Sequence, residues 1–430
     1  MIMKLTRYED IKLIDHLGKL FPLCRSLTGE GTRETLKYFE KYHSEYKRLS
    51  FKTRSKVFDW EIPMEWNIKE AYFEHIETGE RYAEFKKNNL HIVGYSEPIN
   101  KEIDYEELVK HIFTLEKNPN WIPYVTSYYK KYWGFCMKEF DKRKMKRGKY
   151  KVYINSSLKD GNLDLSHAVL KGKLSNEILI SSYVCHPSMA NNELSGPVVL
   201  NGLLSYIKTK YPKNKYSYRF ILQPETIGSI AYLSKYLNHL KKNLICGFSL
   251  SCVGDDRAYS YVKTPFENTL ADKAINAALF KLKNVKAYSF LQRGSDERQY
   301  CSPGIRLPIC TFSRSKFAEY PEYHTSADNL NLVSDKGLEG SLEVLKNIID
   351  AFELGLYPKL VTKCEPQLGK RDLYPTISQY KEKKSLELRM NFLAYCDGKC
   401  SVFDICKLIN CDLKTLNNEY KLLKENNLVT

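Results

Sequence analysis

The sequence lacks the features that would place it among membrane, secreted or low-complexity proteins. It has no uninterrupted apolar run near the roughly 18 residues of a membrane span. Its first segment, MIMKLTRYEDIKLIDHLGKL, carries charges through its apolar positions and lacks the hydrophobic stretch and small-residue cleavage site of a signal peptide. The 12 cysteines form no C-x-x-C pair and suit reduced core residues. We therefore expect a cytoplasmic protein with no membrane span.

The composition that is present is globular. The chain has 430 residues, of which 43% are hydrophobic and 27% charged, enough for several domains and a large core. The formal net charge of +16 is compatible with an anionic partner. Basic residues are nevertheless spread along the chain, with one tight run at 142–149, which favours ordinary surface lysine over a nucleic-acid patch.

The central part of the sequence alternates strand-like and helical segments. Apolar runs suited to buried strands occupy 177–185, 218–223, 245–253 and 307–312. Helical patterns follow at 196–206, 229–240, 268–279 and 341–354. This alternation predicts an α/β fold, a mostly parallel mixed sheet with helices on both faces. Ligands of such sheets bind beyond the carboxyl ends of the strands.

The flanking segments predict two further units. Residues 55–169 contain short runs of alternating apolar and polar residues separated by turns, which predicts a β-rich insert domain with one helix near 105–115. Three compact helical patterns near the end, at 385–395, 402–409 and 413–426, predict a winged-helix domain over 375–430. The α/β domain is then made from 1–54, which contains two helices, and 170–362.

Each predicted strand runs into a loop of polar residues. His186 follows the first strand, Glu225 the second, and His324 lies in the loop after the last. Histidine nitrogens and carboxylate oxygens with room for a water are the ligands of catalytic zinc. Such an ion lowers the pKa of its bound water, and a free glutamate can move the proton. A buried core histidine is the alternative for both His186 and His324, and capping of the following helix is the alternative for Glu225.

The order of these loops resembles the co-catalytic zinc aminopeptidases. More narrowly, motifs such as CRSLTGEGTRETL, SYVCHPSMANNELSG, PETIGSIAYL and EYPEYHTSADNL resemble a bacterial aminopeptidase-like family associated with polysaccharide biosynthesis. The resemblance implies a zinc-aminopeptidase-like domain with a β insert and a C-terminal winged helix. It implies metal ligands at His186, Asn192, Glu225 and His324, with Glu225 as the general base if it is not a ligand.

The sequence departs from the zinc aminopeptidases at three positions that are acidic in that family. Asn192 replaces a bridging aspartate, Pro224 replaces the first residue of a Glu-Glu pair, and Ser251 replaces a third acid. A neutral side chain cannot supply the charge that holds two cations about 3.5–4 Å apart. We therefore expect at most one zinc, and a site that binds no zinc is the alternative. Glu193, beside Asn192, brings a carboxylate to the surroundings of the site.

Three more acids receive expected roles. Asp328 would orient the His324 ring, and Asp296 and Glu297 would bind the amine of a substrate, unless they are ordinary surface acids. The leading hypothesis is a metal-dependent amide hydrolase that acts on a peptide or an amino-acid-modified sugar.

Two other hypotheses remain open. One is a catalytically inactive binding protein in polysaccharide assembly. The other is a DNA-binding regulator that reads DNA through its third C-terminal helix, which carries Lys414, Asn417, Asn418, Lys421 and Lys424. The sequence is compatible with a homo-oligomer and does not decide the oligomeric state.

Overall fold

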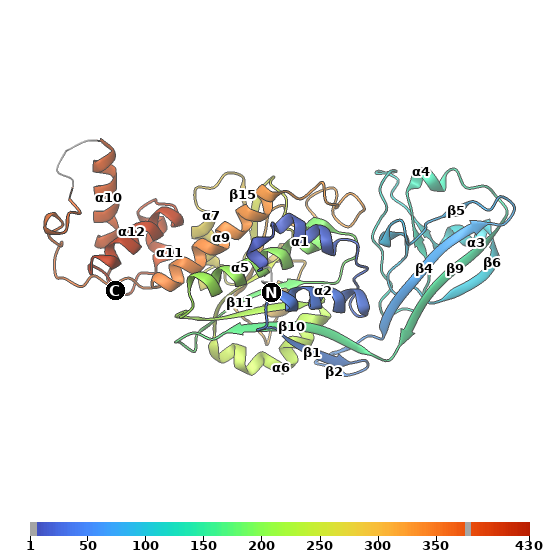
Figure 1. Ribbon diagram of the computed structural model, residues 1–430, viewed down its shortest axis with the longest axis horizontal. Helices are drawn as coiled ribbons and strands as arrows, with labels where there is room; N and C mark the ends of the chain where they lie inside the picture. Colours follow the sequence, from blue (N-terminus) through green and yellow to red (C-terminus); the bar gives the residue numbers. More distant parts are fainter. Residues whose placement is uncertain (1–6, 375–379) are drawn as a thin grey trace, which may run out of the picture.

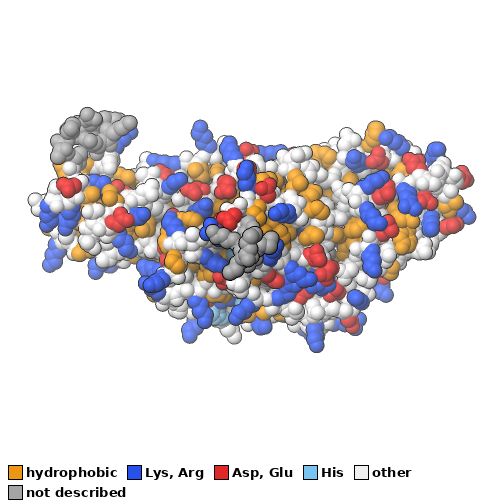
Figure 2. Space-filling view, in the orientation of Figure 1, with side chains coloured by type: hydrophobic (Ala, Val, Ile, Leu, Met, Phe, Trp, Pro, Cys, Tyr) orange, Lys and Arg blue, Asp and Glu red, His pale blue; other side chains and the backbone are white. Residues whose placement is uncertain are grey.

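The structure is a computed structural model that describes residues 7–374 and 380–430, with side chains omitted for 375–383. The molecule is elongated (Figure 1). The α/β domain occupies the middle, the β-rich insert lies at one end, and the C-terminal helices lie at the other. Figure 2 shows lysine and arginine side chains scattered over the visible face and interspersed with acids, rather than gathered in one patch.

A mixed eight-stranded sheet forms the middle of the α/β domain, in the order β1-β10-β12-β11-β13-β16-β14-β15. Strands β12, β11, β13 and β16 are mutually parallel, β1 and β10 are antiparallel additions at one edge, and β14 is antiparallel to β16. The bounds are β1 Lys47–Lys52, β10 Asn162–Leu170, β11 Glu177–Tyr183, β12 Ser217–Gln223, β13 Leu244–Leu250, β14 Tyr259–Val262, β15 Val285–Tyr288 and β16 Ile309–Ser313. This confirms the predicted fold class.

Helices cover both faces of this sheet (Figure 1). One face carries α1 Leu13–Leu20, α2 Glu30–Tyr42, α5 Ser195–Lys210, α7 Leu270–Leu279 and α9 Asp335–Leu354, and the other carries α6 Ile227–Asn243 and the short α8 Glu297–Tyr300. Strand β11 carries apolar residues on both of its faces. Ile178 and Ile180 belong to the core under α5, whereas Leu179 belongs to the core under α6, so neither face of the strand meets water.

The chain reverses its direction of winding at β11. Helix α5 leads from β11 to β12 on one side, and α6 then carries the chain back past β11 to β13 on the other side. Loops that leave neighbouring strands in opposite directions open a crevice at their carboxyl ends. The loop that contains His186 begins at this point.

The insert is built on a four-stranded antiparallel sheet in the order β5-β4-β9-β6. Its elements are β2 Lys56–Val57, β3 Trp60–Glu61, β4 Glu65–His75, β5 Arg81–Tyr82, β6 Ile99–Asp104, α3 Tyr105–Leu108, β7 Ile112–Phe113, β8 Phe135–Cys136, α4 Glu139–Lys142 and β9 Lys149–Lys159. The helix expected near 105–115 is thus only one turn, followed by a 3₁₀ turn and β7. Strand β10 falls within the range expected for the insert but pairs with β1 and β12 of the main sheet, because the turn at Asp160 and Gly161 sends the chain back to it.

The C-terminal helices are α10 Tyr380–Ala394, α11 Val402–Leu408 and α12 Leu413–Glu425, and the expected domain start at 375 lies outside the described residues. Isolated bridges from Lys359 to Asp397 and from Leu360 to Val429 form only a stub of a wing. Helix α12 packs on α9 of the α/β domain. Within the described residues, no helix has the length and hydropathy that a membrane span requires.

Candidate functional site

The two predicted histidines lie together at the crevice although they are far apart in the sequence. His186 follows β11 and His324 lies in the loop after β16, and their ring centroids are 5.2 Å apart. Tyr124 of the insert contacts both rings, with centroids at 5.2 Å from His186 and 5.1 Å from His324. The amide of Tyr124 donates to the carbonyl of His324 at 2.9 Å. The insert therefore forms one wall of the site.

Glu225 also reaches the crevice. Its Oε2 lies 3.8 Å from Nε2 of His186, and its Oε1 accepts a hydrogen bond from Ser295 Oγ at 2.7 Å. Thr226, with φ of 63°, makes the sharp turn from β12 into α6. The Thr226 side chain does not cap this helix, and it is Asp296 that accepts from the Thr226 amide, so the geometry favours the site role of Glu225 over helix capping.

Glu193 holds the His186 segment instead of lying open to a ligand. Its side chain and that of Arg25 are both fully buried, and Arg25 Nε donates to Glu193 Oε1. The other oxygen accepts from the amides of Cys185 and His186. Arg25 also donates to the carbonyls of His186 at 3.1 Å and Leu20 at 2.6 Å. A buried ion pair thus braces the backbone that presents the imidazole.

The electrostatics of the two imidazoles differ. Burial works against protonation of His186, but its bond to Glu193 and the charge of Glu225 outweigh burial and raise its pKa. Burial, with a smaller contribution from His186, lowers the pKa of His324 to about 3. His324 is therefore neutral at physiological pH and can act as a ligand.

Tyr183, the last residue of β11, fills the place between two of the three altered positions. Its hydroxyl is bonded to Asn192 Oδ1 and lies 2.6 Å from Ser251 Oγ. Three neutral polar groups thus replace the acidic environment that would hold a second cation. The carbonyl oxygen of Asn192 is already engaged by the phenol. This leaves His186, Glu225 and His324 as the candidate ligands.

Asp328 supports a loop and not the imidazole that it was expected to orient. Its carboxylate accepts from the amides of Ala190, Asn191 and Asn192 at 3.0, 2.6 and 3.0 Å, and from Tyr320 Oη at 2.7 Å. The His324 ring instead stacks on its neighbour Tyr323, with centroids 3.9 Å apart. Four donors explain why this acid is tolerated in the interior.

Asp296 and Glu297, expected to bind a substrate amine, are both completely buried. Asp296 accepts from Thr226 N, Ser229 Oγ and Gln223 Nε2 at 2.8–3.1 Å. Glu297 accepts from the amides of residues 294 and 295 and from Thr311 Oγ1. Asp296 and Glu297 therefore support the loop beside Glu225. Neither carboxylate is open to the crevice, where a substrate amine would bind.

The donor set fits one metal ion better than two. His324 Nε2 is buried and, within the described residues, has no hydrogen-bond partner, beside a second imidazole and a carboxylate. Two nitrogens and one oxygen are a ligand set that zinc accepts. Within the described residues, ligand atoms of Cys185, His186 and Glu193 lie within 4.8 Å of one another, whereas those of His186, Glu225 and His324 do not all come so close, so binding of one ion by these three requires their side chains to move together. Glu193 is engaged by Arg25, and burial raises the pKa of the Cys185 thiol far above its usual value, so the group that contains Cys185 suits a cation less well.

Comparisons with known proteins agree with this architecture. Residues 14–355 match the model of a family described as a domain of unknown function, DUF4910, and residues 356–430 match a winged helix-turn-helix model. The chain belongs to the DUF4910 family. A Clostridium acetobutylicum protein named for polysaccharide biosynthesis and an aminopeptidase-like domain is 41% identical over 395 residues, which are 90% of this chain and 89% of that one.

Solved structures extend the likeness. A crystal structure from Clostridium acetobutylicum, of a protein named as a peptidase, is 37% identical with a TM-score of 0.88 and covers 97% of this chain and 95% of its own. A zinc aminopeptidase from Bacillus subtilis shares the fold at 13% identity, with a TM-score of 0.57 and coverage of 80% and 95%. The expected aminopeptidase-like family with a C-terminal winged helix is thereby confirmed.

Three residues of the site were not identified from the sequence. Arg25 lies in a short segment between two helices and Tyr124 in the insert, and both reach the site only through long-range packing. Tyr183 could have been suspected, because it ends the strand that leads to His186. Its position gave no sign that its hydroxyl meets Asn192.

Proposed function

We propose that this member of the DUF4910 family is an amide hydrolase that uses one zinc ion held by His186, Glu225 and His324. The observation that carries the proposal is the buried, unpartnered Nε2 of His324 beside the other two side chains. A buried ring nitrogen without a partner is costly unless a ligand completes it. Asn192 is left out of the ligand set because its oxygen is bonded to Tyr183.

The residues of the chain orient the ligands and shield the site. A zinc ion in such a site polarises a carbonyl and makes water more acidic. Glu193 keeps His186 in place through the backbone and its Nδ1, which lies 3.3 Å away. Glu225 faces His186 in the crevice as the third ligand, and Ser295 fixes its second oxygen. Tyr124 restricts access of water from the insert side.

The substrate class in this proposal is a peptide or an amino-acid-modified sugar. The aminopeptidase-like fold supports an amide bond as the target, and the name of the 41% identical relative supports a place in polysaccharide biosynthesis.

The test combines metal content with turnover. Protein purified without chelator is incubated with zinc, and the bound metal is measured by ICP-MS. Hydrolysis of aminoacyl anilides and aminoacyl amino-sugars is then followed with the zinc-loaded and the chelated protein. We expect close to one zinc per chain, and zinc-dependent turnover that His324→Ala and Glu225→Gln abolish.

The matched control is His91→Ala, which removes a histidine of the insert whose Nδ1 bonds the carbonyl of Cys136. It should leave zinc content and turnover unchanged. Less than about 0.2 zinc per chain in the wild type, against the single ion expected of one site, would contradict the proposal.

A second candidate is a binding protein without turnover, favoured by the neutral Tyr183, Asn192 and Ser251 cluster. It predicts saturable binding of the same amides to the zinc-free protein, unaffected by Glu225→Gln and without product formation.

A further inference from the structure

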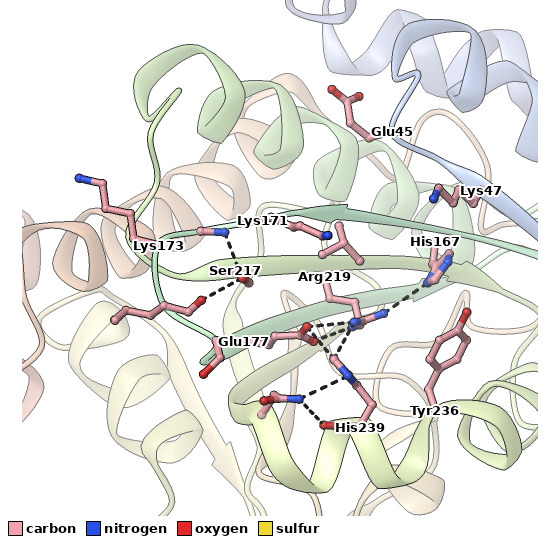
Figure 3. A pocket seen from close by; sticks show the side chains of 15 residues that line it. Glu45, Lys47, His167, Lys171, Lys173, Glu177, Ser217, Arg219, Tyr236 and His239 are labelled. Atoms are coloured by element: carbon pink, nitrogen blue, oxygen red, sulfur yellow. Dashed lines mark hydrogen bonds and ion pairs between the residues drawn. The ribbon is translucent and has the colours of Figure 1, made fainter.

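A second groove lies on the α6 face of the sheet (Figure 3). It has a volume of about 620 Å³. Glu177, at the amino end of β11, lines it, whereas the candidate site begins after Tyr183 at the other end of that strand. At about 3.3 Å per residue, the two places are roughly 20 Å apart.

Strand pairing explains which side chains form the floor. Lys47 of β1 pairs with His167 of β10, and the next residue on that face, Val169, pairs with Arg219 of β12. Lys171, one residue beyond the end of β10, also lines the groove. Helix α6 supplies the opposite wall, including Tyr236 and His239 (Figure 3).

The acids of the groove are already paired. Glu177 binds Arg219 at 2.7 Å and His239 at 2.8 Å. Glu45 binds Lys208 at 2.7 Å. Neither carboxylate is left to repel an anion or to neutralise the remaining lysines.

Three lysines of the groove are exposed, namely Lys47, Lys171 and Lys173. In the part of the chain that the structure describes, none of the three lies within 4.0 Å of a carboxylate oxygen. Unpaired cations around a concave surface attract anions and raise their local concentration.

His167 adds a neutral donor. Arg219 Nη1 donates to Tyr232 Oη at 2.8 Å and lies 3.4 Å from His167 Nδ1, which the Tyr232 hydroxyl also contacts at 2.9 Å; since arginine can only donate, Nδ1 is the acceptor. This arrangement leaves the proton of the neutral ring on Nε2, which has no partner among the described residues. Burial, helped by Arg219 and Lys47, lowers the pKa of His167 to about 4, so the ring stays in this form at physiological pH.

We propose that this groove binds a phosphate-bearing small molecule, with Lys47, Lys171 and His167 Nε2 around the phosphate and the ring of Tyr236 against the organic part. Lysine ammonium groups and N–H donors are the usual phosphate ligands of proteins. The volume suits a molecule of nucleotide size. The proposal does not depend on the zinc site.

Calorimetric titration with inorganic pyrophosphate and with uridine diphosphate tests this. We expect saturable binding of one ligand per chain that weakens as salt screens the lysines. Lys47→Ala/Lys171→Ala should weaken binding at least about tenfold, because two charge-assisted bonds are lost. His324→Ala should bind as the wild type does, which separates this proposal from the hydrolase. Tighter binding of uridine diphosphate than of pyrophosphate is expected if Tyr236 contacts the organic part.

The control is Lys283→Ala/Lys286→Ala, which removes the same charge from exposed lysines outside the groove. It should leave the affinity within about twofold of the wild type, since screened charges far away contribute little. Binding that does not saturate, or that both double variants weaken equally, would overturn the proposal and indicate attraction by the net charge alone. Thermal unfolding verifies that each variant is folded.

Discussion

Replacing Arg25 with methionine tests how the His186 segment is held. Arg25 and Glu193 both have 0% exposed side chains, so the substitution leaves a buried carboxylate without its guanidinium. Removal of one partner of a buried ion pair costs about 3–5 kcal/mol. For domains of this size, that corresponds to a fall in the thermal midpoint of roughly 6–20 °C. The amides of Cys185 and His186 and the nearby imidazole recover part of the loss.

A substitution at Glu193 tests how much of this loss comes from its unpaired charge. Glu193→Gln keeps an oxygen for the two backbone amides but carries no charge, so Arg25→Met/Glu193→Gln should be more stable than the sum of the single losses predicts. We expect a coupling free energy of at least about 2 kcal/mol, within the range for residues in contact. The assay is thermal unfolding followed by near-ultraviolet circular dichroism, on all four proteins of the cycle.

Measuring zinc binding by the same proteins shows whether Glu193 only supports His186 or is itself a ligand of the ion. If Glu193 only supports His186, Glu193→Gln weakens zinc binding by about 10–100-fold and leaves the saturating stoichiometry unchanged. A loss of less than about 1 kcal/mol for Arg25→Met, below the cost of one buried unpaired group, would refute this account of the ion pair. Strictly additive variants would refute it as well.

Three other results are expected. His43 has both ring nitrogens buried without partners, and burial lowers its pKa to about 4. His43 is therefore protonated below about pH 6.5 in the unfolded chain but only below about pH 4 in the folded chain. The free energy of unfolding falls as the pH drops between these two values. His43→Phe should raise the free energy of unfolding by about 1 kcal/mol at pH 7 and by more at pH 5, measured by urea unfolding, and an equal change at both values would contradict the cause. Asn192→Asp places a carboxylate beside the Tyr183 hydroxyl and should tighten zinc binding at least about tenfold in competition with a chelating dye, whereas unchanged affinity would place Asn192 outside the reach of the ion. In gel shifts over a salt series, Lys414→Ala/Lys421→Ala should reduce DNA affinity no more than the control variant Lys283→Ala/Lys286→Ala does. A larger loss for the α12 variant would show that α12 contacts DNA.

The last expectation follows from the position of α12. Lys414 Nζ lies 2.8 Å from Glu343 of α9, and Asn417 donates to the carbonyl of Asn347 at 2.8 Å. Lys424 donates to the carbonyl of Leu354. The winged-helix family leaves DNA binding open, but much of the face expected to contact DNA is used within the chain.

Strands with a clear run of apolar residues were predictable from the sequence. The apolar runs that became β11, β12, β13 and β16 were identified, because strands buried on both faces consist mostly of apolar residues with few polar ones between them. Strands β14 and β15 were not identified. They have four residues each, and β15 is exposed along most of its length, so no apolar pattern marks it.

By itself, the sequence determined the succession of β11, β12, β13 and β16 with their helices and the loops in which His186, Glu225 and His324 lie, because local periodicity and strand ends depend on neighbouring residues. The tertiary structure alone decided that Arg25 pairs with Glu193 and that Tyr183 occupies the place between Asn192 and Ser251. Such contacts join residues without any repeating spacing and depend on how separate elements pack. The chemical types of the residues were enough to predict which ones lie in the site. Which residue contacts which depends on how the elements pack.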